Sequence, residues 1–364
     1  MQQTFRKSTI KDVAKMASVS TSTISAFVSG RESVCSAETA ERIRQAVVEL
    51  RYTPNSLTQG LRKARTRTVG VAFDQPSRTD PGVQNSFIER AWHGILAEAD
   101  DQRHAVLYYP HFIRSEELFH QYLDGRADGL IFNLGVEDTI ASYIASAGIP
   151  AVLLGRSPEN AGGCAVVYAD ERETLDLALT HLWTRGHRHI GFLAGPDVAW
   201  RCEDGYEEKS SCVAQRRRAA FREWMAARGH YSDGLIQEGR TWTGQFGVVA
   251  SAFDAWRGLA EPFPSAILCA NDHLAMALRQ VANVRGLKVP EDLSIVGIDN
   301  IRPVAELRPW LTSVEIDAEA LGRQAVKSLL RIVEGAKPDE CHAMMSVSRL
   351  IVRDSTGEFQ GDCI

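Results

Sequence analysis

Small polar side chains gather near the amino terminus, in the stretch KDVAKMASVSTSTISAFVSG, residues 11–30. We expect its exposed positions to carry little but lysine, serine and threonine, because the apolar residues recur at helical spacing and face inward. Hydroxyl groups donate and accept hydrogen bonds. The chemistry that this segment offers is therefore hydrogen bonding to a polar surface, with positive charge beside it.

Positive charge is concentrated at the same end of the chain. Residues 1–67 hold 12 lysines and arginines against 5 aspartates and glutamates, whereas the remaining residues hold 29 against 41. The net charge of -5 thus separates into +7 for the first part and -12 for the rest. A basic head on an acidic body is typical of a protein that meets a polyanion with one end only.

Patterns that would indicate an enzyme or a metal site are weak. The sequence contains no GxSxG, Walker A, HExxH or GxGxxG motif. His181, His187 and His189 could suggest a metal site, but a structural role at the start of a strand is the stronger alternative. The seven cysteines form no CxxC pair, which predicts reduced thiols. We expect no catalytic residues, no metal and no cofactor.

Three short helices are predicted in the head. Thr9 and Asp12 form a capping box for the first helix, Ser20 caps the second, and the third begins at Ser36. The predicted buried positions are Ile10, Val13, Ala14 and Ala17, then Ile24, Phe27 and Val28, then Ile43, Val47 and Leu50. Three helices with a tight turn between the first two match a helix-turn-helix.

The rest of the chain predicts an α/β core. TPNSLTQGLRKARTRT, which follows Tyr52, is a marginal helix that we expect to order only against a partner. From Thr68 onward apolar strands alternate with amphipathic helices, which is typical of parallel sheets. Eight strands are more than one compact lobe needs, so we expect two lobes with a ligand cleft at the carboxyl ends of strands. The strands are predicted at 68–73, 105–109, 129–134, 151–155, 165–169, 189–195, 265–270 and 293–299.

Neither a membrane span nor secretion is indicated by the sequence. It has no run of about 18 apolar residues, and the first 30 residues lack the apolar region of a signal peptide. We therefore expect a cytoplasmic protein.

Ordered motifs along the chain resemble the LacI/GalR family of bacterial repressors. The stretches that carry this resemblance are STIKDVAKMASVSTSTISAFVSG, RYTPNSLTQGLRKARTRTVGV, GIPAVLLGR, HLWTRGHRHIGFLAGP, LCANDHLAMAL, GLKVPEDLSIVGIDN, LTSVEIDAEALGRQAV and LIVRD. The resemblance implies a DNA-reading head, a hinge helix, a two-lobed effector-binding core like that of periplasmic sugar-binding proteins, and a homodimer.

The resemblance also implies domain boundaries. The DNA-binding domain would span residues 1–53, the hinge helix and linker 54–67, and the effector-binding core 68–364. Within the core, the first lobe would comprise about 68–165 and 298–325, and the second about 166–297 and 326–360.

The resemblance assigns the polar face of the second helix to the major groove, where base edges offer donors and acceptors. Thr21, Ser22 and Ala26 would occupy base-reading positions, and Ser20, Thr23 and Ser25 would be placed for phosphate contacts. Many members carry arginine at the position of Ala26, so we expect a different base preference there. Thr9, Asn55 and Leu61 complete the DNA-binding set.

Leu61 has two alternative roles. The resemblance makes it an apolar wedge that enters the minor groove together with the same residue of the partner subunit. The alternative is that Leu61 merely packs the hinge.

Five core residues fall on or beside the family's effector-contacting positions: Arg217, Trp242, Asn271, Asp272 and Asp299. Carboxylate, amide and guanidinium groups suit neighbouring hydroxyls, and an indole can stack on a sugar, so a carbohydrate effector is expected. The structural alternatives are that Asp299 caps a loop, that Asn271 and Asp272 cap a helix, and that Trp242 is a core residue. Because Arg217 lies in a run of three arginines, its alignment could shift by one residue.

One loop departs from the family pattern. Residues 197–215 are about a dozen residues longer than usual and could cover the cleft. A disulfide between Cys202 and Cys212 is conceivable, but a reducing cytoplasm argues against it.

The expected function is sequence-specific transcriptional regulation, with repression as the expected mode, at a palindromic double-stranded operator under the control of a small effector. The alternative is a small-molecule sensor or solute-binding protein of the same core fold, which would leave the basic head unexplained.

Overall fold

The structure is a computed structural model, and it describes most of the chain. The described residues are 9–28, 35–50, 65–73, 86–109, 125–132, 138–196, 200–201, 207–208, 212–240, 242, 244–301, 308 and 310–361. The chain divides into two compact units, Met1–Thr66 and Arg67–Ile364.

The first unit contains three helices around a small apolar core. They are α1 (Ile10–Ala17), α2 (Thr21–Val28) and α3 (Ala37–Glu49). Their fully buried residues are Val13, Ala14, Ala17, Ile24, Ile43 and Ala46, whereas Ile10, Phe27, Val47 and Leu50 are only partly buried against them. The predicted helix-turn-helix is therefore present. Of the positions predicted as buried, Val13, Ala14, Ala17, Ile24 and Ile43 are fully buried, and the side chain of Val28 lies outside the described residues.

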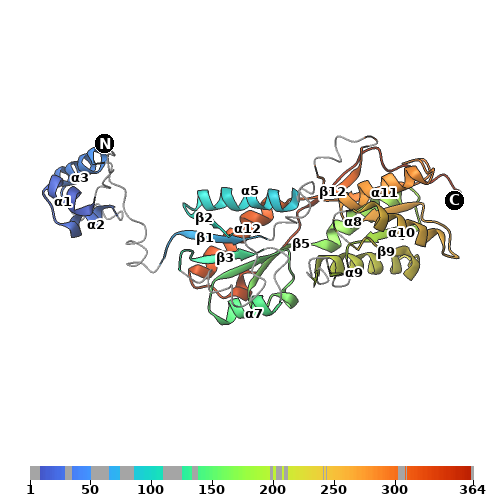
Figure 1. The fold of residues 1–364 in the computed structure, drawn as a ribbon, viewed down its shortest axis with the longest axis horizontal. Coiled ribbons are helices and arrows are strands. Elements are labelled where there is room, and N and C mark those ends of the chain that lie inside the picture. The colour runs from blue at the N-terminus through green and yellow to red at the C-terminus, as the bar shows by residue number, and fades with distance from the viewer. Residues whose placement is uncertain are drawn as a thin grey trace. The chain divides into compact units, whose positions relative to one another are not determined.

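The second unit contains two six-stranded sheets, each forming one lobe (Figure 1). The first sheet has the order β13-β5-β4-β3-β1-β2, and all of its pairings are parallel. Its strands are β1 (Thr68–Ala72), β2 (Ala105–Tyr108), β3 (Gly129–Phe132), β4 (Ala151–Leu154), β5 (Ala165–Ala169) and β13 (Ala343–Met345).

Successive residues of the first sheet face opposite layers, as the two-residue period of a strand requires. Val69, Val71, Ile131 and Val152 belong to the core cluster that contains residues of α5 (Ser86–Asp101) and α12 (Ala318–Val333). Leu130, Phe132, Leu153 and Val166 pack instead with residues of α7 (Asp138–Ser146). Both faces of the sheet are thus covered, as Figure 1 shows for α5 and α7.

The second sheet has the order β14-β12-β11-β10-β6-β9, and only β14 is antiparallel to its neighbour. Its strands are β6 (Ile190–Ala194), β9 (Ile236–Glu238), β10 (Ala266–Cys269), β11 (Ser294–Ile298), β12 (Thr312–Ile316) and β14 (Ser348–Ile351). Four helices contact it: α8 (Glu171–Thr184), α9 (Cys212–Ala226), α10 (Phe246–Arg257) and α11 (Asp272–Val284).

Strand pairing differs from the lobe boundaries expected from the sequence. Segment 298–325 was assigned to the first lobe, but β12 pairs with β11 and β14 in the second sheet. Segment 326–360 was assigned to the second lobe, but β13 pairs with β5 in the first sheet, and α12 packs on β3, β4 and β5. The chain crosses between the lobes just after β5, just after β12 and between β13 and β14, since these strands are paired with different sheets.

Short elements complete the description. The 3₁₀ helices are η3 (Pro158–Asn160), η4 (Asp233–Leu235) and η6 (Pro338–Cys341). In the long loop, β7 (Trp200–Arg201) pairs antiparallel with β8 (Glu207–Glu208). Cys202 and the side chain of Cys212 lie outside the described residues. No helix in the described segments has both the length and the apolar character that a membrane crossing requires.

Candidate functional site

The turn between α1 and α2 is built by local hydrogen bonds. Thr9 and Asp12 form the predicted capping box, with the Thr9 amide donating to Asp12 Oδ2 over 2.8 Å. Ser18 ends α1 in the left-handed conformation, at φ 54°, which glycine adopts more easily than serine. The Val19 amide donates to Ala14 O over 3.0 Å. The chain is thereby turned sharply into α2.

Hydroxyl groups cluster at the start of α2. Ser20 Oγ accepts from the Thr23 amide over 3.1 Å and lies 2.6 Å from Ser22 Oγ and 2.8 Å from Thr23 Oγ1. Thr21 and Ser22 are exposed, whereas Thr23, Ser25 and Ala26 are partly buried. The first turn of α2 carries no acidic residue, which suits the approach of an anion to a helix amino terminus.

The opposite face of α2 is held by the core of the head. Ile24 has no exposed surface and packs in one cluster with Val13 of α1 and Ile43 of α3. Because this stripe is buried, the rotation of α2 about its axis is fixed and Thr21 and Ser22 must face outward. Asn55 and Leu61 lie outside the described residues.

The three consecutive arginines of α9 bind three different sets of partners. Arg217 is buried: its Nε donates to Glu171 Oε2 over 2.6 Å, and its Nη1 donates to Ala270 O. Arg216 Nη2 donates to Gly155 O, after β4 of the first lobe, over 3.1 Å. Arg218 pairs with Glu238 Oε1 at 2.9 Å.

Arg217 lies among three acidic groups. Burial alone would lower the pKa of its guanidinium, but the charges of Glu171, Asp299 and Asp272 outweigh it and raise the pKa. Arg217 and Glu171 are each about 5% exposed in their side chains. Because the Nε and Nη1 donors are already used within the protein, Arg217 has a structural role in the second lobe.

Asn271 performs the capping role that the sequence offered as an alternative. Its Oδ1 accepts from the Leu274 amide over 2.9 Å, at the start of α11, and its Nδ2 donates to Trp242 O over 2.8 Å. The Trp242 ring is only partly buried and lies against Gly195, where an added Cβ would come within 2.5 Å of the ring. Asn271 thus ties the tryptophan backbone to the carboxyl end of β10.

Asp272 has no exposed surface. Its Oδ1 accepts from Ser313 Oγ over 2.7 Å, and its Oδ2 accepts from the Ile301 amide over 2.9 Å. Burial, followed by the nearby charge of Asp299, raises the pKa of Asp272 well above its usual range. This geometry differs from the expected effector contact: Asp272 fixes the segment after β11 from inside the lobe.

Asp299 is placed differently from Asp272. It is only partly buried, and its carboxylate accepts no hydrogen bond from the part of the chain that the structure describes. Its φ of 104° is unfavourable for a residue with a side chain, and Asn300 follows at φ 50°. The Asp299 amide donates to Val314 O over 2.8 Å, and Arg90 Nη2 donates to Asp299 O over 2.5 Å.

Burial raises the pKa of Asp299 to about 6, although Arg217 and Arg90 oppose the rise. A strained backbone at the end of β11 that holds a partly buried carboxylate, with no hydrogen bond from the described residues, is a feature of ligand sites. The structure therefore brings Arg217, Trp242, Asn271 and Asp299 to the carboxyl ends of β6, β10 and β11, with Asp272 behind them.

Three functional candidates have no motif in the sequence: Glu171, Arg216 and Arg90. Glu171 comes two residues after the end of a predicted strand, yet only the buried ion pair with Arg217 marks it. Arg90 pairs with Glu315 at 3.2 Å and reaches Asp299, and both partners are more than 200 positions away in the chain. Sequence spacing cannot indicate such contacts.

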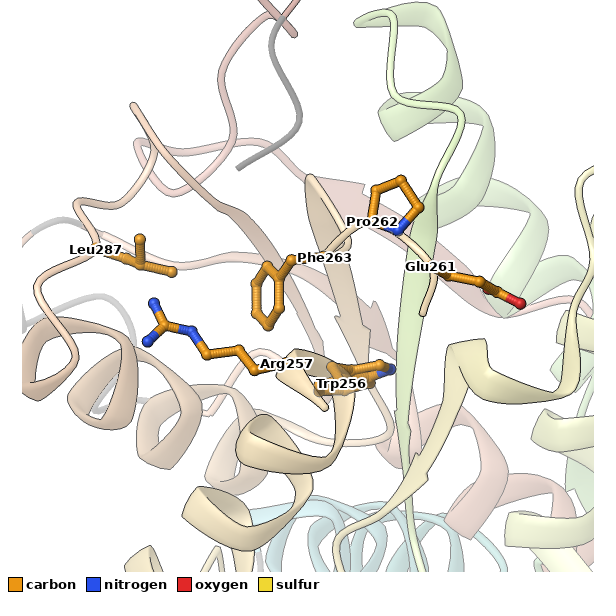
Figure 2. Close-up of a pocket in the computed structure, with 6 residues that line it drawn as sticks. All are labelled: Trp256, Arg257, Glu261, Pro262, Phe263 and Leu287. Carbon is orange, nitrogen blue, oxygen red and sulfur yellow. The ribbon is translucent and has the colours of Figure 1, made fainter. Parts of the chain in front are cut away.

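A separate hollow of about 230 Å³ lies in the second lobe (Figure 2). Its lining residues are Trp256, Arg257, Glu261, Pro262, Phe263 and Leu287. Pro262 and Phe263 precede β10, whereas Asn271 follows it, so the hollow and Asn271 lie at opposite ends of that strand. The hollow is not part of the effector candidate.

The histidines near β6 have structural partners. His187 Nδ1 lies 2.9 Å from Ser265 Oγ, and its Nε2 lies 3.2 Å from Gly357 O. His181 Nε2 lies 2.9 Å from Thr356 Oγ1. Burial lowers the pKa of both, that of His181 to about 4. These neutral imidazoles hold the segment after β14 to the second lobe.

Comparisons with known proteins agree with this architecture. Residues 9–55 match the model of the "Bacterial regulatory proteins, lacI family", and residues 179–356 match that of the "Periplasmic binding protein-like domain". The chain is 26% identical to the NTD biosynthesis operon regulator NtdR of Bacillus subtilis over 360 residues, which is 96% of this chain and 99% of that protein. It is 29% identical to the HTH-type transcriptional repressor PurR of Aliivibrio salmonicida over 332 residues, 90% and 92% of the two chains.

A solved structure extends the likeness to nearly the whole chain. The Lac repressor dimer bound to operator and the anti-inducer ONPF superposes with a TM-score of 0.77 at 26% identity, covering 97% of this chain and 100% of that one. The likeness to this structure therefore covers both the helix-turn-helix of the first unit and the two lobes of the second. The chain belongs to the lacI family of bacterial regulatory proteins, DNA-binding transcriptional regulators with an effector-binding core.

Proposed function

We propose that this chain is a transcriptional repressor whose α2 reads an operator in the major groove. The observation that carries this proposal is the division of α2 into a buried stripe at Ile24 and an exposed hydroxyl face at Thr21 and Ser22. Hydroxyl groups can pair with either donors or acceptors on base edges. Ser20, Thr23 and Ser25 would contact phosphates, which orient the head but carry no sequence information. Thr9, at the amino terminus of α1, belongs to the same DNA-contacting set.

The proposed assembly is a homodimer in the cytoplasm on a roughly palindromic operator. The Lac repressor neighbour is described as a dimer bound to operator, and two-fold symmetry in the protein requires matching half-sites in the DNA. The domain boundaries proposed for this assembly are a head of 1–53, a hinge helix and linker of 54–67 that includes Asn55 and Leu61, and a core of 68–364.

The proposed effector is a sugar or sugar derivative. Asp299 offers hydroxyl donors a carboxylate that accepts no hydrogen bond from the described residues. Asn271 and Arg217 lie beside it in the same lobe, and the partly buried Trp242 offers a ring for stacking. Asp272 supports this set from the interior. Effector binding then shifts operator affinity, and a hundredfold change requires about 2.7 kcal/mol of coupling.

Operator selection tests the proposal. The full chain is used to select duplexes from a random pool at about 0.15 M salt, and the selected duplex is then titrated with variants. Thr21→Ala and Ser22→Ala should each weaken binding and relax the preference at one base pair, at a cost of about 1–3 kcal/mol. Gln45→Ala, an exposed polar change on α3, is the matched control and should leave binding unchanged. Enrichment of no sequence would overturn the proposal.

A further inference from the structure

Arg216 connects the two lobes of the core. It belongs to α9 of the second lobe, but its Nη2 donates to Gly155 O over 3.1 Å, and its guanidinium carbon lies 5.2 Å from the centre of the Tyr168 ring. Gly155 follows β4 and Tyr168 belongs to β5. The guanidinium therefore lies at the carboxyl ends of first-lobe strands, where ligands of parallel sheets bind.

Two donors of this guanidinium are buried and unused. Arg216 Nε and Nη1 have no hydrogen-bond partner within the described residues. Leaving a buried charged donor without a hydrogen-bond partner is unfavourable, because the donor loses its bonds to water and gains none in return. Arg217, the next residue, differs from Arg216 because its guanidinium pairs directly with Glu171.

The nearby carboxylates of Glu159 and Asp170 do not take the place of a hydrogen-bond partner for Arg216. Glu159 is exposed, and its pKa is lowered first by the Ser157 hydroxyl and also by the charge of Arg216, but it makes no hydrogen bond to the guanidinium within the described residues. Asp170 is occupied in capping α8, where Oδ1 accepts from the Arg172 and Glu173 amides over 2.9 and 3.3 Å. The Arg216 guanidinium carbon lies over the Tyr168 ring, a contact that favours a positive charge there.

We propose that Arg216 binds an anionic group of the effector, a carboxylate or a phosphate, and thereby selects charged metabolites over their neutral analogues. Anionic oxygens are the acceptors that a planar guanidinium with open N–H donors pairs with best. The inference rests on the proposed function and names the chemical class of its ligand. Asn271, Asp299 and Trp242 then hold the polyol part of the same molecule from the second lobe.

The first test uses simple anions as probes. The full chain is titrated with sodium phosphate and with sodium acetate against sodium chloride of equal ionic strength, and the melting temperature is followed. We expect a saturable rise with phosphate or acetate that is at least tenfold weaker in Arg216→Gln and partly restored in Arg216→Lys. Arg222→Gln, an exposed change on the same helix, is the control and should behave as the wild type.

Two outcomes of this test overturn the proposal. One is the absence of any saturable effect beyond chloride up to about 50 mM. The other is an equal effect in Arg216→Gln, which would mean an adventitious ion only. A lower melting temperature of Arg216→Gln without added anions, together with an unchanged anion response, would make Arg216 a link between the lobes and not a ligand site.

A second arm separates the two anion sources. Glucose is compared with gluconate and with glucose 6-phosphate by calorimetry on wild type and Arg216→Gln. Tighter binding of gluconate identifies a carboxylate, tighter binding of the phosphate ester identifies a phosphate, and preference for glucose contradicts the inference. Operator binding of Arg216→Gln without metabolite should stay within twofold of wild type, whereas failure of the wild type itself to select an operator would count against the proposed function instead.

Discussion

Arg217 and Glu171 form a buried ion pair, with Arg217 Nε 2.6 Å from Glu171 Oε2 and each side chain about 5% exposed. Glu171 begins α8 immediately after the crossing from β5, and Arg217 belongs to α9, so the pair joins two helices on the same face of the second sheet. The same guanidinium also donates to Ala270 O, one residue before the Asn271 cap of α11.

Removing one partner of this pair should destabilise the core strongly. Glu171→Gln removes the carboxylate that pairs directly with the buried Arg217, and losing one partner of a buried ion pair typically costs about 3–5 kcal/mol. Urea unfolding of wild type and variant measures the loss. The control is Arg285→Met, which breaks the exposed pair with Asp254 at 2.7 Å and should lower the free energy of unfolding far less. If the two variants lost similar free energy of unfolding, burial would not be what makes the Arg217–Glu171 pair important.

Asp299 should make stability depend on pH in a defined direction. Its folded pKa of about 6 exceeds the ordinary value of 3.8, so the folded state binds the proton more tightly. The stabilising effect of that proton is present at low pH and is lost as the pH rises from about 4 to about 6. The stability gained by Asp299→Asn should therefore grow over this range, by at most about 3 kcal/mol, and then level off.

Asp254→Asn supplies the control for the pH series. The Arg285 hydrogen bond lowers the pKa of Asp254, so its contribution to stability is lost as the pH falls, and the sign is opposite. A stability difference for Asp299→Asn that does not vary between pH 4 and 6 would contradict the assigned environment of Asp299.

Two glycines allow α5 and α12 to pack backbone to backbone. A Cβ at Gly94 would lie 2.0 Å from Glu319 O, and one at Gly322 would lie 2.1 Å from Ala91 O. Gly94→Ala and Gly322→Ala should therefore force the helices apart and cost at least about 1–3 kcal/mol in urea unfolding. Gly247→Ala in α10 meets nothing within 4 Å and should instead be neutral or stabilising by up to about 1 kcal/mol.

Replacing Ser18 with glycine should stabilise the head. A left-handed conformation costs a residue with a side chain about 1–2 kcal/mol, part of which is offset because glycine also loosens the unfolded chain. Ser18→Gly should raise the melting temperature of the head slightly, and Ser18→Val should lower it by several degrees. If both variants had the same melting temperature as the wild type, the result would contradict the φ of 54° at Ser18.

The sequence predicted what depends on local pattern. All eight strands inferred from apolar runs are present within one or two residues, because a strand buried on both faces is continuously apolar. The strands β9, β12 and β14 were not predicted because IQE, TSVEI and SRLI mix polar and apolar residues in short segments, and β13 was not predicted because AMM is only three residues long. With β12 and β13 missing, the crossings between lobes could not be placed correctly.

The sequence predicted the candidate site less completely than the strands, because contacts between distant parts of the chain bring the site residues together. The capping role of Asn271 was one of two alternatives in the sequence, and the structure shows the cap. Which of the three arginines is buried depends on the rotation of α9 against β6, and the pairing of Arg217 with Glu171 joins residues 46 positions apart. Long-range contacts of this kind leave no spacing signal.

The most direct test of the central claim is the affinity of the full chain for its selected duplex relative to a scrambled duplex of the same composition. Fluorescence anisotropy at about 0.15 M salt measures both. Sequence-specific regulators prefer their own site by about 10³-fold or more, and the Thr21→Ala, Ser22→Ala double variant should lose most of that ratio while keeping its binding to the scrambled duplex. Equal affinity of the wild type for the two duplexes would contradict the account.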